Sequence, residues 1–276
     1  MKVVKRSGEV AEFDRQKLER SLLNSGALPS VVKDVLLTID KQVFDGISTK
    51  QIYKQAFAML KKESNAHAAR YNLRTALQLL GPAGFFFEKF IARLYAAEGW
   101  ETKTNLMLQG RCVSHEVDVA MKKADITMMA ECKFHNSREA VSDVKVPMYI
   151  LSRFNDLKLN RHNIFTKSDI INSCLIVTNN RFSSDAIAFA NCSGLRLLSW
   201  DYPGKDSIRL KIDTKGLYPV TCLTTLTLVE KEKLLILEIL LVEDIMKNTD
   251  CLRKINLSEG RIKNVLKEAS ELCKYL

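Results

Sequence analysis

The sequence has few of the features that would place a protein outside the cell or in a membrane. Its seven cysteines are an odd number and include no C-x-x-C pair, which argues against a structural zinc site and a disulfide framework. Cys132, Cys174 and Cys222 lie in apolar runs and are predicted to be buried thiols. The N-terminus has no apolar signal region, and the longest apolar stretch, residues 234–242, contains Glu238 and is too short to span a bilayer. We therefore expect a cytoplasmic protein with no membrane contact.

The sequence also lacks a G-x-x-x-x-G-K-[ST] loop, internal repeats and Gly/Ser-rich linkers. Without that loop, ATP hydrolysis of the P-loop kind is not expected. The chain does have length and positive charge: its 276 residues are enough for two domains or for one with additions, and the formal net charge is +10. A basic excess of this size favours a polyanionic partner such as DNA, although many basic proteins bind no nucleic acid.

Two short charged motifs stand near the middle of the chain. In Glu-Val-Asp-Val (116–119), polar and apolar residues alternate with the period of a strand, and the mostly apolar residues 126–134 predict a second strand. Residues i and i+2 of a strand share a face, so Glu131 and Lys133 project together, and pairing of the strands would bring Asp118 close to Glu131. Cys132, between them, is expected to pack on the opposite face. Two carboxylates suit Mg²⁺, and the ammonium beside them can offset phosphate charge.

These charged residues also have an ordinary explanation. An E-x-K triplet occurs by chance in most proteins of this size, and two charges on one exposed strand face are usually only solvated. Upstream, Glu88 lies on a predicted helix but outside its apolar stripe, which alone is more typical of a surface residue than of a metal ligand. Beside Asp118 and Glu131, Glu88 would become a candidate third carboxylate.

Together these motifs resemble the PD-(D/E)xK nuclease superfamily and, within it, the Mrr-type restriction endonucleases. The matching segments are, in order, Phe87-Glu88, Gly99-Trp100, residues 116–119, residues 131–133 and a tail over 175–201 similar to T-N-x-x-F…A…A…G…L…D. The resemblance covers about residues 82–204 and implies a mixed sheet flanked by helices. It also implies that Asp118, Glu131 and Glu88 hold Mg²⁺ or Mn²⁺ while Lys133 assists catalysis, as in a bacterial or archaeal Mg²⁺-dependent deoxyribonuclease. Double-strand cleavage would then favour a homodimer or higher homo-oligomer.

The segments after the second motif predict the rest of this domain. They indicate a helix over 141–154, a strand over 173–178, a helix over 183–191 and a strand over 195–200. The polar, basic residues 158–163 fit a DNA-facing loop or a plain exposed connection about equally well. His115 stands where similar sequences commonly have Gly, and a structural or exposed histidine is a more probable interpretation than a substrate contact.

Residues 1–81 predict a short hairpin with a turn at Ser7-Gly8, then a helix capped by Asp14. Further helices are predicted over 29–41, 49–62 and 66–80, and Ser48-Thr49 can cap the second of these. Residues 4–18, 46–52 and 69–74 resemble an ATP cone, the nucleotide-sensing domain best known from ribonucleotide reductases. The resemblance implies that ATP or dATP is an allosteric ligand, bound by Val4, Lys5, Arg6, Lys17 and Thr49. Lys5, Arg6 and Lys17 can converge on a triphosphate through charge-assisted hydrogen bonds. A basic hairpin that binds DNA, or binds nothing, is the alternative.

Residues 205–276 predict short helices over 226–240, 242–248 and 252–255 and a last helix capped by Ser258. They resemble a helix-hairpin-helix module, which grips phosphates through backbone amides. A small helical cap or a dimerisation element explains the pattern equally well.

The sequence thus predicts a multidomain protein of α+β and α/β class, with domains over residues 1–81, 82–204 and 205–276. Our first hypothesis is a metal-dependent DNA endonuclease of the restriction or defence type that is regulated by ATP or dATP. The second is an ATP-sensing DNA-binding regulator with a catalytically inactive nuclease fold, because ATP cones occur in repressors and a fold does not fix function.

Overall fold

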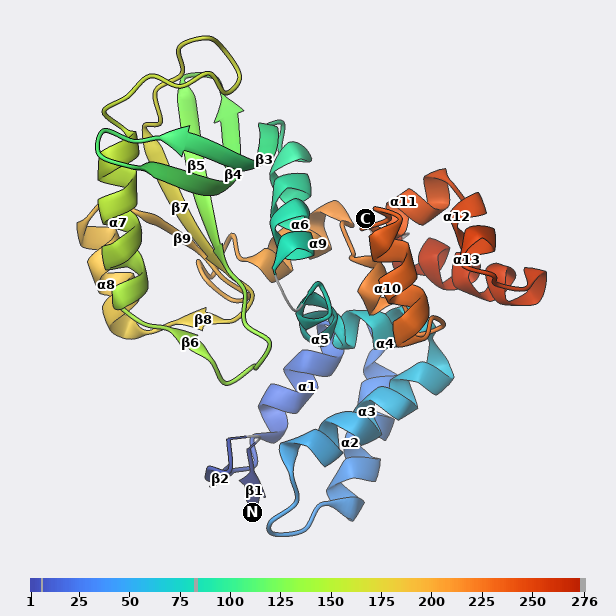
Figure 1. Ribbon diagram of the computed structural model, residues 1–276. Helices are drawn as coiled ribbons and strands as arrows, with labels where there is room; N and C mark the ends of the chain where they lie inside the picture. The colour runs from blue at the N-terminus through green and yellow to red at the C-terminus, as the bar shows by residue number, and fades with distance from the viewer. Residues whose placement is uncertain (6, 82–83, 274–276) are drawn as a thin grey trace. The chain divides into compact units, whose positions relative to one another are not determined.

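The chain folds into two compact units (Figure 1). The computed structural model describes residues 1–5, 7–81 and 84–273. Met1–Ala76 and Tyr218–Leu276 make up the first unit, and Leu77–Leu217 makes up the second. The contacts thus group most of the predicted C-terminal segment with the predicted N-terminal domain, while residues 205–217 stay with the central unit. No helix in the described part of the chain is both long and apolar enough to cross a membrane.

The first unit begins with a hairpin and continues as helices. The strands β1 (Lys2–Val4) and β2 (Val10–Glu12) pair antiparallel. The helices that follow are α1 (Arg15–Leu23), α2 (Pro29–Gln42), α3 (Thr49–Glu63), α4 (Asn65–Tyr71) and α5 (Leu73–Gln78). Leu22, Ile39, Ala56 and Leu60 are fully buried where α1, α2 and α3 pack together. The predicted hairpin and the predicted helices over 29–41 and 49–62 are therefore confirmed.

Side-chain caps fix where the helices of this unit start. Asp14 accepts a hydrogen bond from the Lys17 backbone N–H at 2.8 Å, and Ser48 forms a reciprocal capping box with Gln51 at the start of α3. The predicted helix over 66–80 is wrong as one piece, because the chain turns at Asn72 between α4 and α5. The Asn72 side chain accepts a hydrogen bond from the Tyr53 hydroxyl at 2.6 Å, which ties this turn to α3.

The C-terminal part of the first unit is helical. It contains a 3₁₀ turn over Val220–Cys222 and the helices α10 (Leu228–Ile236), α11 (Val242–Lys247), α12 (Asp250–Lys254) and α13 (Glu259–Cys273). Helix α10 is shorter than the predicted 226–240, because Glu238 has a φ of 61° that a right-handed helix cannot accommodate. Helix α13 packs against α11 and against α4.

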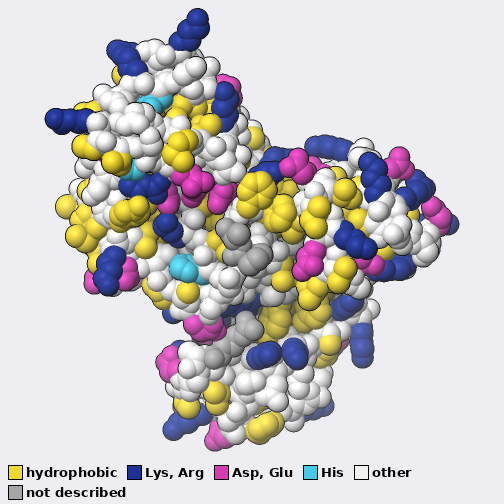
Figure 2. Space-filling view, in the orientation of Figure 1, with side chains coloured by type: hydrophobic (Ala, Val, Ile, Leu, Met, Phe, Trp, Pro, Cys, Tyr) yellow, Lys and Arg dark blue, Asp and Glu magenta, His cyan; other side chains and the backbone are white. Residues whose placement is uncertain are grey.

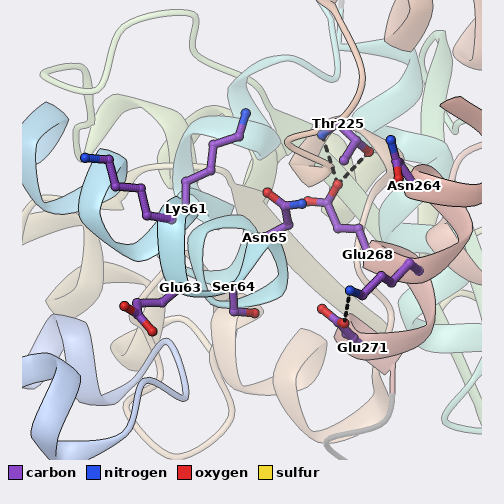
Figure 3. Close-up of a pocket in the computed structure, with 10 residues that line it drawn as sticks. Lys61, Glu63, Ser64, Asn65, Thr225, Asn264, Glu268 and Glu271 are labelled. Carbon is purple, nitrogen blue, oxygen red and sulfur yellow. Dashed lines mark hydrogen bonds and ion pairs between the residues drawn. The ribbon is translucent and has the colours of Figure 1, made fainter.

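Glu268 of α13 holds the loop that precedes α10. This residue is only 1% exposed. Its carboxylate accepts hydrogen bonds from the Thr225 backbone N–H at 2.9 Å and from the Thr225 hydroxyl at 2.6 Å (Figure 3). It also accepts one from the Thr224 backbone N–H at 2.6 Å. Lys61 of α3 donates to the Thr224 carbonyl at 3.0 Å. The α3–α4 junction and α13 therefore hold the same loop, and the side chains around it line a hollow of about 360 Å³ (Figure 3).

The second unit is built on a five-stranded mixed sheet with the order β3-β4-β5-β7-β9. Strands β3 (Glu101–Gln109), β4 (Ser114–Lys123) and β5 (Ile126–Lys133) form an antiparallel meander. Strands β7 (Ser173–Thr178) and β9 (Arg196–Leu198) continue the sheet parallel to β5. The sequence explains this order, because β5 and β7 are apolar runs buried on both faces, as central strands are, whereas β3 alternates exposed and less exposed residues.

Helices cover both faces of this sheet. Figure 1 shows α7 (Lys145–Leu157) and α8 (Ser184–Cys192) on one face, and α6 (Phe85–Ala96) and α9 (Ile208–Lys215) on the other. The predicted mixed sheet flanked by helices is confirmed, including the strand over 173–178. The helix predicted over 141–154 starts later, because Val141–Ser142 forms β6, which pairs in parallel with β8 (Arg181–Phe182).

Candidate active site

The two motif strands separate at Asp118. Strands β4 and β5 pair from Lys123↔Ile126 to Val119↔Ala130, while β4 stays paired with β3 as far as Ser114. At the point of separation, the Asp118 carboxylate accepts a hydrogen bond from the Cys132 backbone N–H at 2.7 Å. This side chain therefore replaces a ladder bond between the strands. We call the opening between β4 and β5, bounded by Asp118, Glu131 and Lys133, the strand fork.

Glu131 lies in the strand fork between two cations. It is 4% exposed, its Oε1 accepts a hydrogen bond from Lys133 Nζ at 2.6 Å, and its Oε2 accepts one from Arg153 of α7 at 2.6 Å. A buried carboxylate needs such partners, because an unpaired charge in the interior is strongly unfavourable. The predicted pairing of Glu131 with Lys133 on one strand face is therefore confirmed.

Glu88 reaches the strand fork from the first turn of α6. The helix starts at Gly84, whose φ of 85° is a left-handed conformation that favours glycine. Phe87 packs against Phe134, just after β5, with ring centroids 5.6 Å apart, which holds the start of α6 beside the end of β5. Glu88 thereby comes within electrostatic range of Asp118 and Glu131.

The carboxyl groups of the strand fork repel one another. Burial, followed by the charges of Asp118, Glu116 and Glu131, raises the pKa of Glu88 to about 7. Burial and the charge of Glu131 raise the pKa of Asp118 to about 6, although the hydrogen bond from Cys132 opposes this shift. Figure 2 shows Asp and Glu side chains gathered on the visible face of the second unit, with Lys and Arg side chains next to them. The strand fork is therefore short of positive charge.

The arrangement restricts how a metal ion could be held. Among the described residues, no three His, Cys, Asp or Glu side chains are placed to hold one ion together. Glu88, Asp118 and Glu131 thus do not form a ready-made three-ligand group. Burial raises the pKa of Cys132 well above its usual value, so this thiol stays neutral and is a poor ligand. Cys174 and Cys222 are buried as predicted, whereas Cys132 is only half-buried, so the prediction of a fully buried thiol is wrong there.

The sequence did not predict the roles of two residues at the strand fork, Arg153 and Asn179. Arg153 is a single arginine in an amphipathic helix, and no spacing marks it; only the placement of α7 on the sheet brings it to Glu131. Asn179 belongs to the T-N-x-x-F tail, but the motif did not indicate its role. Its side chain accepts from the His135 backbone N–H and donates to the His135 carbonyl, each at 2.8 Å, so that it fixes the chain just beyond Lys133.

His115 and the loop after α7 have structural partners. His115 Nε2 lies 2.8 Å from an Asp156 carboxylate oxygen, and Asp156 also accepts the backbone N–H groups of Cys112 and Val113 at the turn between β3 and β4. His115 is therefore a structural histidine, which agrees with the preference for a structural or exposed residue over a substrate contact. In the 158–163 loop, His162 is buried and its backbone pairs with that of Asp169, so the loop is more ordered than a plain exposed connection.

The residues expected to bind nucleotide lie around the hairpin and the start of α3. The Val4 backbone N–H donates to the Ile47 carbonyl at 3.0 Å, which places the hairpin beside Thr49, the first residue of α3. Lys17 is exposed, and exposed Lys5 pairs with Glu9 at 2.9 Å. Arg6 lies outside the described residues. Helix N-termini attract anions, so this end of α3 suits a phosphate group.

The C-terminal helices have no excess of positive charge. Residues 218–276 contain nine Lys and Arg and nine Asp and Glu, whereas residues 1–76 contain fourteen and eight. Glu230 pairs with Arg261 and closes a capping box at Thr227. A module that grips DNA phosphates usually carries a basic surface. The charge balance therefore favours the helical-cap interpretation over the helix-hairpin-helix one.

Comparison with known proteins assigns both ends of the chain. Residues 1–76 match the ATP cone domain, and residues 218–273 match the family described as AF1548-like, C-terminal. An uncharacterized protein of Archaeoglobus fulgidus is 36% identical over 186 residues, which are 66% of this chain and 99% of that protein. This chain therefore belongs to the AF1548-like family, and it carries an ATP-cone domain at its N-terminus. ATP-cone domains bind ATP or dATP as allosteric ligands.

Solved structures give a consistent result for the fold. The crystal structure of the protein of unknown function AF1548 has a TM-score of 0.56 and 33% identity, over 69% of this chain and 98% of that one. The MspJI restriction endonuclease in complex with a 27-mer oligonucleotide has a TM-score of only 0.31 at 13% identity, over 48% of this chain and 29% of that one, which is too low to support an argument. The two family matches do not cover the strand fork, so its resemblance to the Mrr-type endonucleases stays a prediction.

Proposed function

We propose that the protein is a divalent-metal-dependent DNA endonuclease whose activity is regulated by ATP or dATP at the ATP cone. The observation that carries this proposal is the strand fork itself. Asp118 and Glu131 interact electrostatically where two strands part, Lys133 is held 2.6 Å from Glu131, and Glu88 interacts with both carboxylates from another element. A structural role explains the ion pairs of Glu131, but it does not explain three further carboxyl groups that repel one another beside it.

The charge of the strand fork fits a divalent cation. Asp118, Glu116 and Glu131 act on Glu88, and Glu131 acts on Asp118, where the charges of Lys133 and Arg153 oppose it. The raised pKa values of Glu88 and Asp118 express this imbalance, which a bound Mg²⁺ or Mn²⁺ would relieve. Mg²⁺ keeps several waters and needs only one or two carboxylates, so Asp118 and Glu131 suffice, with Glu88 acting through water.

Each side chain then has a defined task. Asp118 and Glu131 would hold the ion, which when bound would supply a Lewis acid for the scissile phosphate and lower the pKa of a bound water. Lys133, whose ammonium lies 2.6 Å from Glu131, would offset the negative charge of the phosphate group undergoing attack. Glu88, held within electrostatic range of Asp118 and Glu131, would accept a proton from water.

The substrate and the regulation follow from charge and family. The excess of cations favours a polyanion, and phosphodiester chemistry at the strand fork makes DNA the proposed substrate. Cleavage of both strands would require two copies of this single site, which favours a homodimer or a higher homo-oligomer. The ATP cone supplies the nucleotide input, and the restriction or defence role is the setting in which such an enzyme would act.

The test is cleavage of supercoiled plasmid with Mg²⁺ or Mn²⁺, with chelator, and with and without ATP or dATP. Wild-type protein and Asp118→Asn are compared with Asp125→Asn, which removes a carboxylate from the exposed turn at the other end of the same strand pair. We expect metal-dependent cutting by the wild type and Asp125→Asn and none by Asp118→Asn. Cutting by Asp118→Asn at the wild-type rate would contradict the proposal.

One observation supports the alternative function. Both oxygens of Glu131 are engaged by cations, and no three-ligand metal group is formed by the described residues, as in a nuclease fold that has lost its metal. An ATP-sensing DNA-binding regulator would shift plasmid DNA in a gel in a nucleotide-dependent manner without cutting it under any metal condition.

A further inference from the structure

Arg153 connects α7 to both strands of the strand fork. Its guanidinium donates through one nitrogen to Glu131 Oε2 at 2.6 Å and through the other to the backbone carbonyl of Glu116. The side chain is 11% exposed, and its guanidinium carbon lies 5.7 Å from the centre of the Tyr149 ring on the same helix. Burial and the ring contact hold the guanidinium in one place, so little freedom is lost when it binds both groups.

The Glu116 carbonyl is not paired with strand β5. Strand β4 pairs with β5 only from Val119 onward, so the β5-facing edge of residues 114–118 has no strand partner. Glu116 is exposed, so without Arg153 this carbonyl would be left to water, with no donor from the protein to fix its position. Arg153 supplies the donor that β5 no longer provides, while Asp118 supplies the acceptor for Cys132. Two side chains thus keep the strand fork open in a fixed shape.

We propose that Arg153 is a positioning residue that fixes the Glu131 carboxylate and the strand fork, so that a divalent cation meets Asp118 and Glu131 already in place. This inference rests on the proposed metal site. Residues that hydrogen-bond a metal ligand typically set metal affinity by about 10- to 100-fold. Arg153 has this relation to Glu131, and it also fixes the strand that carries Asp118.

The contacts of Glu131 leave lone pairs for a cation. A carboxylate offers about four lone-pair positions. Lys133 uses one on Oε1 and Arg153 uses one on Oε2, so each oxygen keeps a second position. A lysine in place of Arg153 has a single ammonium and no planar fork, so it cannot reproduce two bonds in fixed directions.

The experiment measures Mn²⁺ binding to the full chain by electron paramagnetic resonance for five proteins: wild type, Arg153→Gln, Arg153→Lys, Glu131→Gln and Arg181→Gln. Arg181 is exposed on β8 and gives the same charge change away from the strand fork. We expect the Mn²⁺ Kd of Arg153→Gln to rise about 10- to 100-fold, Arg153→Lys to fall between it and wild type, and Arg181→Gln to match wild type. Saturating Mn²⁺ should restore most of the plasmid cleavage of Arg153→Gln and none of that of Glu131→Gln.

The outcomes separate the two proposals. Wild-type or tighter Mn²⁺ affinity in Arg153→Gln, with binding lost in Glu131→Gln, overturns the role of Arg153 and leaves the metal site standing. Absence of Mn²⁺ binding by the wild type overturns the proposed function and the role of Arg153 with it. Tryptophan fluorescence checks folding, since Trp100 and Trp200 both lie in the second unit. If Arg153→Gln does not fold, Arg153→Lys decides: weaker binding supports the inference, and unchanged binding overturns it.

Discussion

Among the residues that the structure describes, two glutamates are buried, one in each unit, and they are stabilised in opposite ways. Glu268 is 1% exposed and accepts three hydrogen bonds from uncharged groups of Thr224 and Thr225. Glu131 is 4% exposed and is bound by two cations, Lys133 and Arg153. Its negative charge helps to raise the pKa of both Asp118 and Glu88.

We propose that the difference separates a structural carboxylate from a functional one. The neutral donors around Glu268 are backbone and hydroxyl groups of one loop, and the glutamate ties that loop to α13. Around Glu131, cations and carboxyl groups are crowded together at a cost in free energy, and Asp118 and Glu88 respond with raised pKa values. Perturbed acids gathered at one place are typical of functional sites.

The largest effect should come from Lys133, the cation of the strand fork nearest the proposed chemistry. Lys133→Ala removes the ammonium that would offset phosphate charge, and loss of one such group costs about 100- to 1,000-fold in rate. We expect plasmid cleavage to fall by at least this factor while Mn²⁺ binding remains. Lys145→Ala, which removes an exposed lysine at the start of α7, is the control and should cut normally. Equal loss in both variants would point to overall charge instead.

Replacement of Glu268 should affect stability and leave the strand fork intact. Glu268→Ala leaves the Thr224 and Thr225 donors buried without an acceptor, which we expect to lower the free energy of unfolding by about 3 kcal/mol. Unfolding in urea followed by circular dichroism should show the loss, because the first unit is largely helical. Tryptophan fluorescence reports the second unit and should shift less. A larger shift in fluorescence than in circular dichroism would contradict the structural role given to Glu268.

The nucleotide site should depend on exposed cations of the first unit. Lys17→Ala removes one positive charge near the hairpin, and we expect the Kd for ATP to rise about 10-fold, which corresponds to about 1.4 kcal/mol. Isothermal titration calorimetry gives this value directly. Lys33→Ala on α2 is the matched control, because Lys33 is also an exposed helical lysine of the same unit. Unchanged affinity in Lys17→Ala would remove Lys17 from the nucleotide site.

The smallest effect should be a dependence of stability on pH in the second unit. The pKa of Glu88 is raised to about 7 and that of Asp118 to about 6, so the folded state favours their protonated forms. Their contribution is therefore most favourable below the unfolded-state pKa of about 4, and it is lost as pH rises toward about 7. The fluorescence-detected urea midpoint should rise as pH falls from about 8 to about 5. Glu88→Gln should flatten this rise, whereas Glu101→Gln, at an exposed residue of β3, should not.

The sequence predicted the parts of the fold that depend on local pattern. Alternation in β4, the apolar runs of β5 and β7 and the caps at Asp14 and Ser48 are local signals, and the structure contains each of them. The approach of Asp118 to Glu131 could be predicted in part, because the register of β4 and β5 runs as far as Val119↔Ala130, the pair next to both residues, before the strands separate.

The remaining features depend on contacts between distant residues. Arg153 reaches Glu131 only through the packing of α7 on the sheet, and no spacing in the sequence encodes that placement. The association of α13 with α4 joins residues about 200 positions apart, and it depends on individual bonds such as that from Arg70 to the Leu272 carbonyl at 3.0 Å. The sequence therefore separated a C-terminal segment that the structure joins to the N-terminal one.

We propose that Glu131 takes part in metal-dependent chemistry, whereas Glu268 stabilises the fold. The most direct measurement is Mg²⁺-dependent plasmid cleavage by Glu131→Gln and Glu268→Gln, each checked for folding by circular dichroism and tryptophan fluorescence. We predict that Glu131→Gln is folded and inactive, and that Glu268→Gln is less stable yet retains metal-dependent cutting below its unfolding transition. Cleavage by Glu131→Gln at the wild-type rate would contradict the account.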